Sequence, residues 1–201
     1  MNHNRILFIT TKNVDYLRNV QEIRLLKEKN AEVTVIGSHS RKYLNRLFYV
    51  YRRLLTVKAS DYGKVFIGFA PQLVLPFWKK KFRKNTVVID FFISMYDTLV
   101  NDRKVFSEKS VPAKLLRWLD RKTVECADQI IVDTNADGKY FEEEFGAEKK
   151  KIKTLYLEAD KAIYYPRRVE KPEHLKDKFV VLYFGSVLPL QGVDVVLESY
   201  R

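Results

Sequence analysis

Short apolar runs alternate with longer helical patterns along most of the chain, and this alternation constrains the fold more than any other feature. Residues 5–11 have the pattern of a buried strand, residues 14–29 that of a helix without glycine or proline, and residues 31–38 that of a second strand. Short loops separate the three segments. A strand, a helix and a strand in this order form a βαβ unit, whose two strands are parallel. The sequence therefore predicts an α/β fold built on a parallel sheet.

The alternation continues beyond this first unit. Further strands are expected at residues 64–69, 86–93 and 128–135, and helices at residues 40–58, 71–82, 110–127 and 136–145. Ser110 is the expected N-cap of the helix that carries Pro112 in its first turn, and Gly146 is the expected C-cap of the last of these helices. Strands that read as continuous apolar runs are buried on both faces. The expected architecture is therefore a Rossmann-like parallel sheet with helices on both faces.

A second, shorter α/β pattern ends the sequence. Residues 179–185 form an apolar run with the length of a buried strand, and four apolar residues between Val193 and Tyr200 recur at the spacing of one helix face. One strand and one helix cannot close a hydrophobic core by themselves. We therefore divide the chain into a first domain at residues 1–165, a linker at residues 166–178 and the truncated start of a second domain at residues 179–201.

Several functional classes lack the residues that they need. The single cysteine, Cys126, cannot form an internal disulfide, which fits a reducing compartment. The loop at residues 10–13 lacks the glycines of a dinucleotide-binding fingerprint, and the three histidines show no metal-ligand spacing. No apolar run approaches the roughly 20 residues of a membrane-spanning helix. We therefore expect neither a metal nor a cofactor.

The net charge of +12 is unevenly distributed. Residues 1–84 contain 18 Lys and Arg against 5 Asp and Glu, whereas the rest of the chain contains 19 against 20. All of the positive excess therefore lies in the first 84 residues. Such a concentration of cations indicates an anionic partner, whether a membrane surface, a nucleic acid or an acidic substrate.

Two segments of this basic region combine cations with large apolar side chains. Residues 40–58 form an amphipathic helix, and no acid occurs between Glu32 and Asp61. The second segment, PFWKKKFRK at residues 76–84, places aromatic rings among cations, a mixture typical of a membrane interface. The expected membrane-binding residues are Lys42, Arg46, Arg53, Trp78, Lys80 and Lys81. Two alternatives stay open: the apolar face of the helix could pack on the sheet with its cations solvated, or the same mixture could bind RNA.

Polar residues lie within and after the strand expected at residues 86–93. Ligands of parallel sheets bind beyond the carboxyl ends of the strands. Asp90 lies inside this apolar strand, where a carboxylate is costly unless it is paired or faces a cleft. The loop that follows offers Ser94, Tyr96 and Asp97, of which Asp97 is the strongest candidate for a ligand contact. Asp97 could instead cap a helix that begins at Thr98.

Three passages of the sequence resemble a known family. They are DRKTVECADQIIVDT at residues 120–134, KKIKTLYLEADKAIYYPR at residues 150–167 and FGSVLPLQGVDVVLESY at residues 184–200. Each is similar to a passage of the GT-B glycosyltransferases of the large group 1 family, also called family 4. The resemblance implies the N-terminal, acceptor-side half of a GT-B fold, followed by the first strand and helix of the donor-binding domain.

The resemblance also implies roles for individual residues. Asp97 lies in a loop that carries an acceptor-side or catalytic residue in the family, and it would contact sugar hydroxyls. The residues expected to line the acceptor cleft are Thr11, Lys12, Asn13, Asp90, Ser94, Tyr96 and Thr134. The residues expected in the donor-binding loop are Gly185, Ser186, Gln191 and Gly192. Ser186 and Gln191 stand where the family often has Arg and Lys, which face the donor diphosphate.

A function follows from this resemblance. The full enzyme would transfer a hexose from a nucleotide sugar to a lipid-linked or glycan acceptor, as in polysaccharide biosynthesis. It would be cytoplasmic and peripheral on the inner face of the membrane, would bind an anionic membrane surface and would need no metal. The present chain alone is expected to be inactive, because the donor site is built mainly from the second domain. Two alternatives remain: a non-catalytic membrane-anchoring subunit of a two-chain glycosyltransferase, and an α/β domain that binds nucleic acid. Nucleic acid is a less favoured partner than an anionic membrane.

Overall fold

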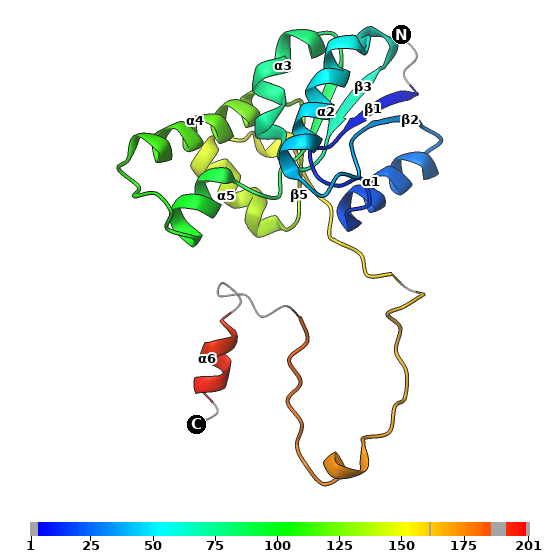
Figure 1. The fold of residues 1–201 in the computed structure, drawn as a ribbon, viewed down its shortest axis with the longest axis vertical. Helices are drawn as coiled ribbons and strands as arrows, with labels where there is room; N and C mark the ends of the chain where they lie inside the picture. The colour runs from blue at the N-terminus through cyan, green and yellow to red at the C-terminus, as the bar shows by residue number, and fades with distance from the viewer. Residues whose placement is uncertain (1–3, 161, 186–191, 200–201) are drawn as a thin grey trace. The chain divides into compact units, whose positions relative to one another are not determined.

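A computed structural model describes residues 4–160, 162–185 and 192–199 of the chain. It divides into two compact units, Met1–Glu158 and Ala159–Arg201, and each is described by itself (Figure 1). Among the described residues, no helix is both long and apolar enough to cross a bilayer.

The first unit alternates strands and helices along its whole length (Figure 1). Its strands are β1 (Arg5–Ile9), β2 (Glu32–Ile36), β3 (Lys64–Ile67), β4 (Thr86–Asp90), β5 (Gln129–Val132) and β6 (Ile152–Thr154). Its α-helices are α1 (Leu17–Glu28), α2 (Tyr43–Thr56), α3 (Leu75–Phe82), α4 (Val111–Cys126) and α5 (Asn135–Phe145). The strands form one six-stranded sheet in the order β2-β1-β3-β4-β5-β6, and every pair is parallel. The predicted α/β, Rossmann-like fold is confirmed.

Helices cover both faces of this sheet, because successive strand residues point to opposite sides. On one face, Leu7 and Ile9 of β1 join a large core that includes residues of α2, α3, α4 and α5. On the other face, Phe8 stacks on Phe66 at 5.1 Å, and α1 packs over this smaller core through Ile23 and Leu26. The sheet is therefore the middle layer of three.

The strand order reverses once, between β1 and β3. The chain moves outward from β1 to β2 and then returns past β1 to place β3 on its other side. In doubly wound sheets such a reversal separates the loops that follow the two central strands, and ligands bind there beyond the carboxyl ends. The topology therefore directs attention to the loops after Ile9 and Ile67.

The expected helix ends are found where the sequence placed them. Ser110 caps α4 by accepting a hydrogen bond from the amide of Ala113, and Pro112 lies in the first turn. Gly146 ends α5 with a φ of 72°, a left-handed conformation that glycine adopts without strain.

The second unit departs from the prediction. Helix α6 (Val193–Glu198) forms, but residues 179–185 make no strand. Phe179 is 93% exposed and Leu182 82% exposed. A helix satisfies its backbone hydrogen bonds internally, whereas a strand needs a neighbouring strand. The expectation of a first strand in this unit is therefore wrong for the structure of this chain.

Candidate functional site

The loops after β1 and β3 are joined by side-chain hydrogen bonds. Thr11 Oγ1 donates to the carbonyl of Phe69 at 2.9 Å, and Tyr43 of α2 donates to Thr11 Oγ1 at 3.3 Å. Arg46 Nε donates to the carbonyl of Thr11 at 3.1 Å. Thr11 itself is fully buried. It therefore fixes the loop rather than presenting its hydroxyl to a ligand.

Arg46 does not have the role expected of it. Its side chain is buried, and its Nη1 also donates to the carbonyls of Ser40 and Arg41 at 2.7 and 3.0 Å. A guanidinium whose donors are used by backbone carbonyls inside the protein cannot contact lipid. The assignment of Arg46 to the membrane surface is corrected to a structural role, the attachment of α2 to the loop after β1.

Lys12 and three aromatic rings gather at the strand-order reversal. The Lys12 ammonium lies 4.9 Å from the ring centroid of Phe69 and 5.2 Å from that of Tyr16. Tyr16 and Phe69 meet edge to face at 6.0 Å, and Phe69 and Phe92 lie 5.8 Å apart. All four side chains are half-buried. We call Lys12, Tyr16, Phe69 and Phe92 the switch-point cluster.

Arg18 of α1 ties the ends of three strands together beneath this cluster. Its Nε and Nη2 each donate to the Asp90 carboxylate at 2.7 Å, and its Nη1 donates to the carbonyl of Leu155 at 3.1 Å. The same guanidinium pairs with Asp133 and lies 5.1 Å from the ring centroid of Phe92. It thereby holds the carboxyl ends of β4, β5 and β6 in one arrangement.

The expectation that Asp90 binds an acceptor is corrected by this network. Asp90 is 1% exposed, and Arg18 takes both of its oxygens. A bidentate, buried ion pair leaves no lone pair of Asp90 directed to solvent. Of the two possibilities that the sequence left for this carboxylate, pairing and facing a cleft, the structure has pairing.

Glu22 adds an excess acid to the same network. Its Oε1 lies 3.7 Å from Arg18 Nε, yet neither oxygen of this buried carboxyl accepts a hydrogen bond among the described residues. Burial, and then the neighbouring Asp90 carboxylate, raise the pKa of Glu22 well above its usual range. A protonated Glu22 can donate to Asp90, whereas two carboxylates cannot bond to each other. The network therefore favours one proton held between the Glu22 and Asp90 carboxyl groups.

The loop after β4 is organised by an acid that the sequence did not single out. Asp120 of α4 is fully buried, and its Oδ2 accepts from Ser94 Oγ and from the amide of Tyr96, both at 2.8 Å. Its Oδ1 accepts from Gln72 Nε2 at 2.9 Å. Burial raises the pKa of Asp120, and these hydrogen bonds oppose that rise. Ser94 and Tyr96 are both buried, so their expected contact with an acceptor is corrected to a role in holding the loop.

Asp97 remains partly exposed at the start of a π-helical turn, Asp97–Asp102. Its Oδ1 accepts from Asn101 Nδ2 at 2.8 Å and from the Tyr140 hydroxyl at 3.4 Å. Burial and the nearby Asp97 carboxylate raise the pKa of Tyr140, so its hydroxyl remains a donor. The N-cap position of this turn is occupied by Tyr96, and Asp97 is the first residue inside the turn. The alternative in which Asp97 is the N-cap of a helix is therefore wrong.

The remaining expected site residues of the first unit are Thr134 and Asn13. Thr134 caps α5 in a capping box with Asp137. Asn13 is half-buried, and its carbonyl accepts from Asn19 Nδ2 at 2.8 Å. In the second unit, Gly192 precedes α6 with a φ of 60° and Gly185 has a φ of 151°. Ser186 and Gln191 lie outside the described residues.

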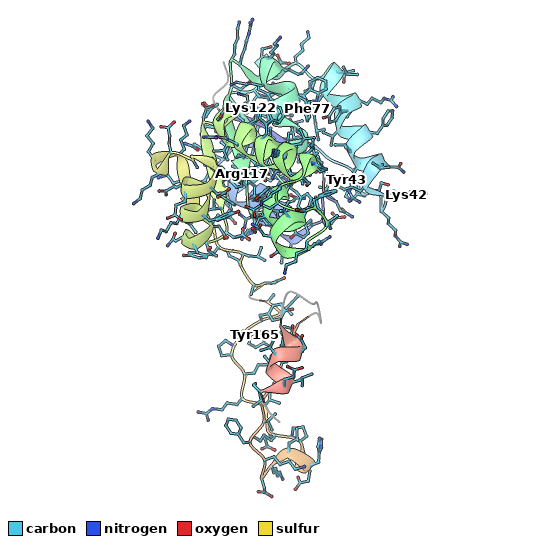
Figure 2. The ribbon with its side chains drawn as sticks, turned by 90° about the vertical axis from the view of Figure 1, so that its left-hand side faces the viewer. Lys42, Tyr43, Phe77, Arg117, Lys122 and Tyr165 are labelled. Carbon is cyan, nitrogen blue, oxygen red and sulfur yellow. The ribbon has the colours of Figure 1, made fainter. Side chains whose placement is uncertain are left out.

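Helices α2 and α3 present a basic and apolar surface. Leu44, Phe48 and Leu55 of α2 are 75%, 70% and 72% exposed, and Phe77 of α3 is 62% exposed. The two helices touch through Tyr51 and Trp78, whose rings lie 5.7 Å apart. The exposed cations around these side chains are Arg41, Lys42, Arg52, Arg53, Lys79 and Lys80. Figure 2 shows Lys42 at the start of α2 and Phe77 on α3. We call these apolar and basic residues the α2–α3 surface.

Two of the expected interfacial residues, Trp78 and Lys81, are only partly exposed. Trp78 is half-buried, packs against the main core and has the Lys81 ammonium 5.9 Å from its ring centroid. Phe77, which was not singled out, is the exposed aromatic residue of α3.

A separate cavity of about 410 Å³ lies at the beginning of α4. It is lined by Tyr96, Glu108, Lys109, Lys114 and Arg117. The Arg117 guanidinium lies 5.6 Å from the Tyr96 ring centroid and also pairs with Glu144 of α5. Figure 2 labels Arg117 on α4. The positive charge that lines this cavity is thus partly neutralised by Glu108 and Glu144.

Several residues of the site were missed by sequence reasoning. Tyr16, Phe69 and Phe92 each lie next to an expected strand or helix end, which is a usable signal once the strand order is known. Arg18 carried no local signal, because its partners are up to 137 residues away. Asp133 was visible only as a polar residue after a strand.

The fold and these contacts define a doubly wound α/β domain with a candidate ligand site at its strand-order reversal. A scan against models of known protein families finds no match for this chain, and a search of curated proteins finds no significant similarity.

Proposed function

We propose that this chain is the acceptor-side part of a glycosyltransferase that transfers a hexose from a nucleotide sugar to a lipid-linked or glycan acceptor. The observation that carries the proposal is the switch-point cluster, because it combines aromatic faces with charged groups at the edge where such sheets bind ligands. A pyranose ring has an apolar face of C–H groups that packs on an aromatic ring, and hydroxyls that need polar partners. The cluster offers both.

Asp97 is the proposed contact to acceptor hydroxyls. Its carboxylate is partly exposed, and its second oxygen, Oδ2, makes no hydrogen bond among the described residues. A charge-assisted hydrogen bond from a hydroxyl contributes about 1.5–3 kcal/mol. In the complete enzyme, Asp97→Asn should therefore lower kcat/KM roughly ten- to a hundredfold, with little change in Tm.

The gene itself supplies the test of this function. Cells that lack it should make a lipid-linked or surface glycan that is one hexose shorter by mass spectrometry, and the wild-type gene should restore the hexose. The Asp97→Asn gene should restore less of it. Glycans and lipids of unchanged mass in the deletion strain would contradict the proposal.

Attachment to the inner face of the cytoplasmic membrane is the second part of the proposal. Its support is the α2–α3 surface, where apolar side chains are exposed among cations and no acid occurs between Glu32 and Asp61 or between Asp61 and Asp90. Each cation close to an anionic leaflet contributes about 1 kcal/mol, and salt screens this attraction. The exposed rings and leucines can enter the headgroup region.

Co-sedimentation with vesicles that contain phosphatidylserine tests this attachment. Lys42→Glu, Arg53→Glu and Lys80→Glu, introduced together, should abolish binding, because all three cations are exposed on the α2–α3 surface. The matched control reverses three exposed cations elsewhere, Arg121, Lys139 and Lys150, and should retain most of the binding. Equal loss in both variants would show that only net charge matters, and full competition by RNA would favour the nucleic-acid alternative.

A non-catalytic subunit of a two-chain enzyme is the second candidate. The exposed apolar side chains of residues 179–184 favour it, since a separate donor-binding chain could cover them. Both candidates predict that the 201-residue chain alone binds UDP- and GDP-hexoses no tighter than millimolar by isothermal titration. They differ in whether the purified chain retrieves one stoichiometric partner polypeptide that itself binds a nucleotide sugar.

A further inference from the structure

We propose that the switch-point cluster is a subsite for an anionic sugar, whose ring packs on Tyr16, Phe69 and Phe92 and whose acidic group pairs with Lys12. This inference rests on the proposed function and deepens it, because it names the acceptor as a glycan or glycolipid with a carboxylate or phosphate on its acceptor sugar.

The first argument is the state of Lys12. Its ammonium is half-buried between two rings, and no carboxylate lies within ion-pairing distance of it in the described part of the chain. The nearest acid along the sequence, Asp15, is directed to His39 Nδ1 at 2.8 Å. Ring faces offset only a small part of a desolvated positive charge. An anion that binds here would complete the missing charge pair.

The second argument is the aromatic surface beside this cation. The rings of Tyr16, Phe69 and Phe92 form a continuous row, with centroid separations of 6.0 and 5.8 Å, and each ring remains partly exposed. None of the three rings belongs to the hydrophobic cores that cover the two faces of the sheet. Partly exposed rings beside a cation can pack on the C–H face of a sugar ring.

The third argument is that contacts within the protein order the aromatic rings before a ligand binds. The Arg18 guanidinium lies against Phe92, and Thr11 Oγ1 bonds to the carbonyl of Phe69. The buried Arg18 thus packs against the Phe92 ring, and the bond from Thr11 fixes the backbone that carries the Phe69 ring. A surface that is ordered before binding loses less entropy when a ligand arrives.

The fourth argument is the opposite charge at the other end of the cluster. The Asp133 side chain is 36% exposed and can accept from sugar hydroxyls. Burial, and then the Asp133 carboxylate, raise the pKa of Tyr16, so the phenol stays neutral and can donate its hydrogen. Lys12 can pair with the one acidic group of an anionic sugar, and Asp133 can accept hydrogen bonds from its hydroxyls. A nucleic-acid strand, which carries a phosphate on every residue, needs a row of cations at this edge.

The test uses the 201-residue chain and three probes, sodium glucuronate, glucose 6-phosphate and glucose, in titrations followed by NMR. At least one anionic sugar should bind about ten- to a hundredfold tighter than glucose, which is the effect of one charge-assisted contact. A preference for glucuronate assigns a carboxylate to the natural acceptor, and a preference for glucose 6-phosphate assigns a phosphate.

Variants locate the effect. Lys12→Met keeps the aliphatic stem and should remove the preference for the anionic sugar while glucose binding stays unchanged. Phe69→Leu should weaken all three probes. The matched control, Lys58→Met, removes another Lys charge at an exposed position outside the cluster and should behave as wild type.

Three results would overturn the inference: equal affinities for charged and neutral sugars, an anionic preference that survives Lys12→Met, and displacement of every sugar by oligouridine that itself binds tighter. The proposed function fails separately. If the anionic preference is absent while gene deletion still removes a hexose, the acceptor class is wrong and the glycosyltransferase assignment stands. If no sugar binds and no hexose is lost, both fall.

Discussion

Phe8 and Phe179 both lie in apolar runs of similar length, but they have opposite environments. Phe8 is fully buried in the first unit, whereas Phe179 is 93% exposed in the second. Leu7 and Leu182 differ in the same way, at 0% and 82% exposed. The side chains are the same, so the difference lies in their neighbours. Leu7 and Phe8 belong to β1, which pairs with β2 and β3 and has helices over both faces.

The second unit shows what an apolar pattern achieves without such neighbours. Its α6 forms, because helical hydrogen bonds are internal, yet Val195, Val196 and Leu197 stay 50–67% exposed. Residues 179–185 do not gain a ladder partner among the described residues and stay irregular. Periodicity therefore selects the type of element, and burial depends on what else is present to pack against.

The largest expected effect of this difference is on proteolysis. Trypsin should cut first after Arg168, Lys176 and Lys178, which are exposed and lie outside helices and strands. Cuts after Arg52 or Arg53 of α2 should be slower by a factor of about a thousand or more, because they require the first unit to open at a cost of at least about 5 kcal/mol. Mass spectrometry of a time course measures both. Early cuts in α2 would show that the first unit is not the better packed one.

The next largest effect concerns Arg18. Arg18→Met should lower the free energy of unfolding by about 3–5 kcal/mol, because Asp90 would remain buried without its partner. Chemical denaturation measures this loss. Arg24→Met is the control on the same helix, since Arg24 pairs with Glu28 and Glu158 at the surface, and its midpoint should barely change. Similar midpoints for the two variants would mean that the Arg18 network is not what holds the strand ends.

Two neighbouring leucines of α2 reproduce the comparison within one helix. Leu54 is fully buried and Leu55 is 72% exposed. Leu54→Ala should cost about 2–5 kcal/mol through lost contacts and a cavity, whereas Leu55→Ala should stay within about 0.5 kcal/mol. Only Leu55→Ala should weaken vesicle binding without changing stability. A large stability loss in Leu55→Ala would place that residue in the core and remove it from the α2–α3 surface.

The smallest effect is a pH dependence caused by Glu22. Its pKa is raised in the folded protein, so the stability it contributes is fully present below its unfolded pKa of about 4.3 and is lost as pH rises through the raised value. The Tm of the wild type should therefore fall as pH rises above the unfolded pKa of Glu22, and the Tm of Glu22→Gln should fall less. Glu28→Gln, an exposed control on α1, should follow the wild type. Parallel curves for Glu22→Gln and the wild type would contradict a proton shared by Glu22 and Asp90.

The strands and helices of the first unit could be predicted because their signals are local. Continuous apolar runs, period-3.6 patterns, Ser110 and Gly146 are each read within a few residues. The site could be predicted only in part. Lys12 was expected at the cleft from the family resemblance of its loop, whereas Arg18 was missed because its partners come from three distant strand ends.

The α2 helix shows the limit of a helical wheel. The wheel assigned Arg46 to the solvated face because arginine is charged, and the structure buries it instead beside Val50 and Leu54 on the sheet side of α2. The carbonyl of Thr11, after β1, and the carbonyls of Ser40 and Arg41, before α2, accept its hydrogens. A wheel records polarity along one helix and contains no information about carbonyls on another segment.

The same Arg46 has a thermodynamic consequence. It belongs to the helix whose outer side is the α2–α3 surface, and it donates to the carbonyl of Thr11, the residue directly before Lys12. Any displacement of α2 at a lipid surface would change the position of that carbonyl and of the loop attached to it. Linkage is reciprocal, so if lipid binding alters the affinity of Lys12 for an anion, a bound anion must alter the affinity of α2 for lipid by the same factor.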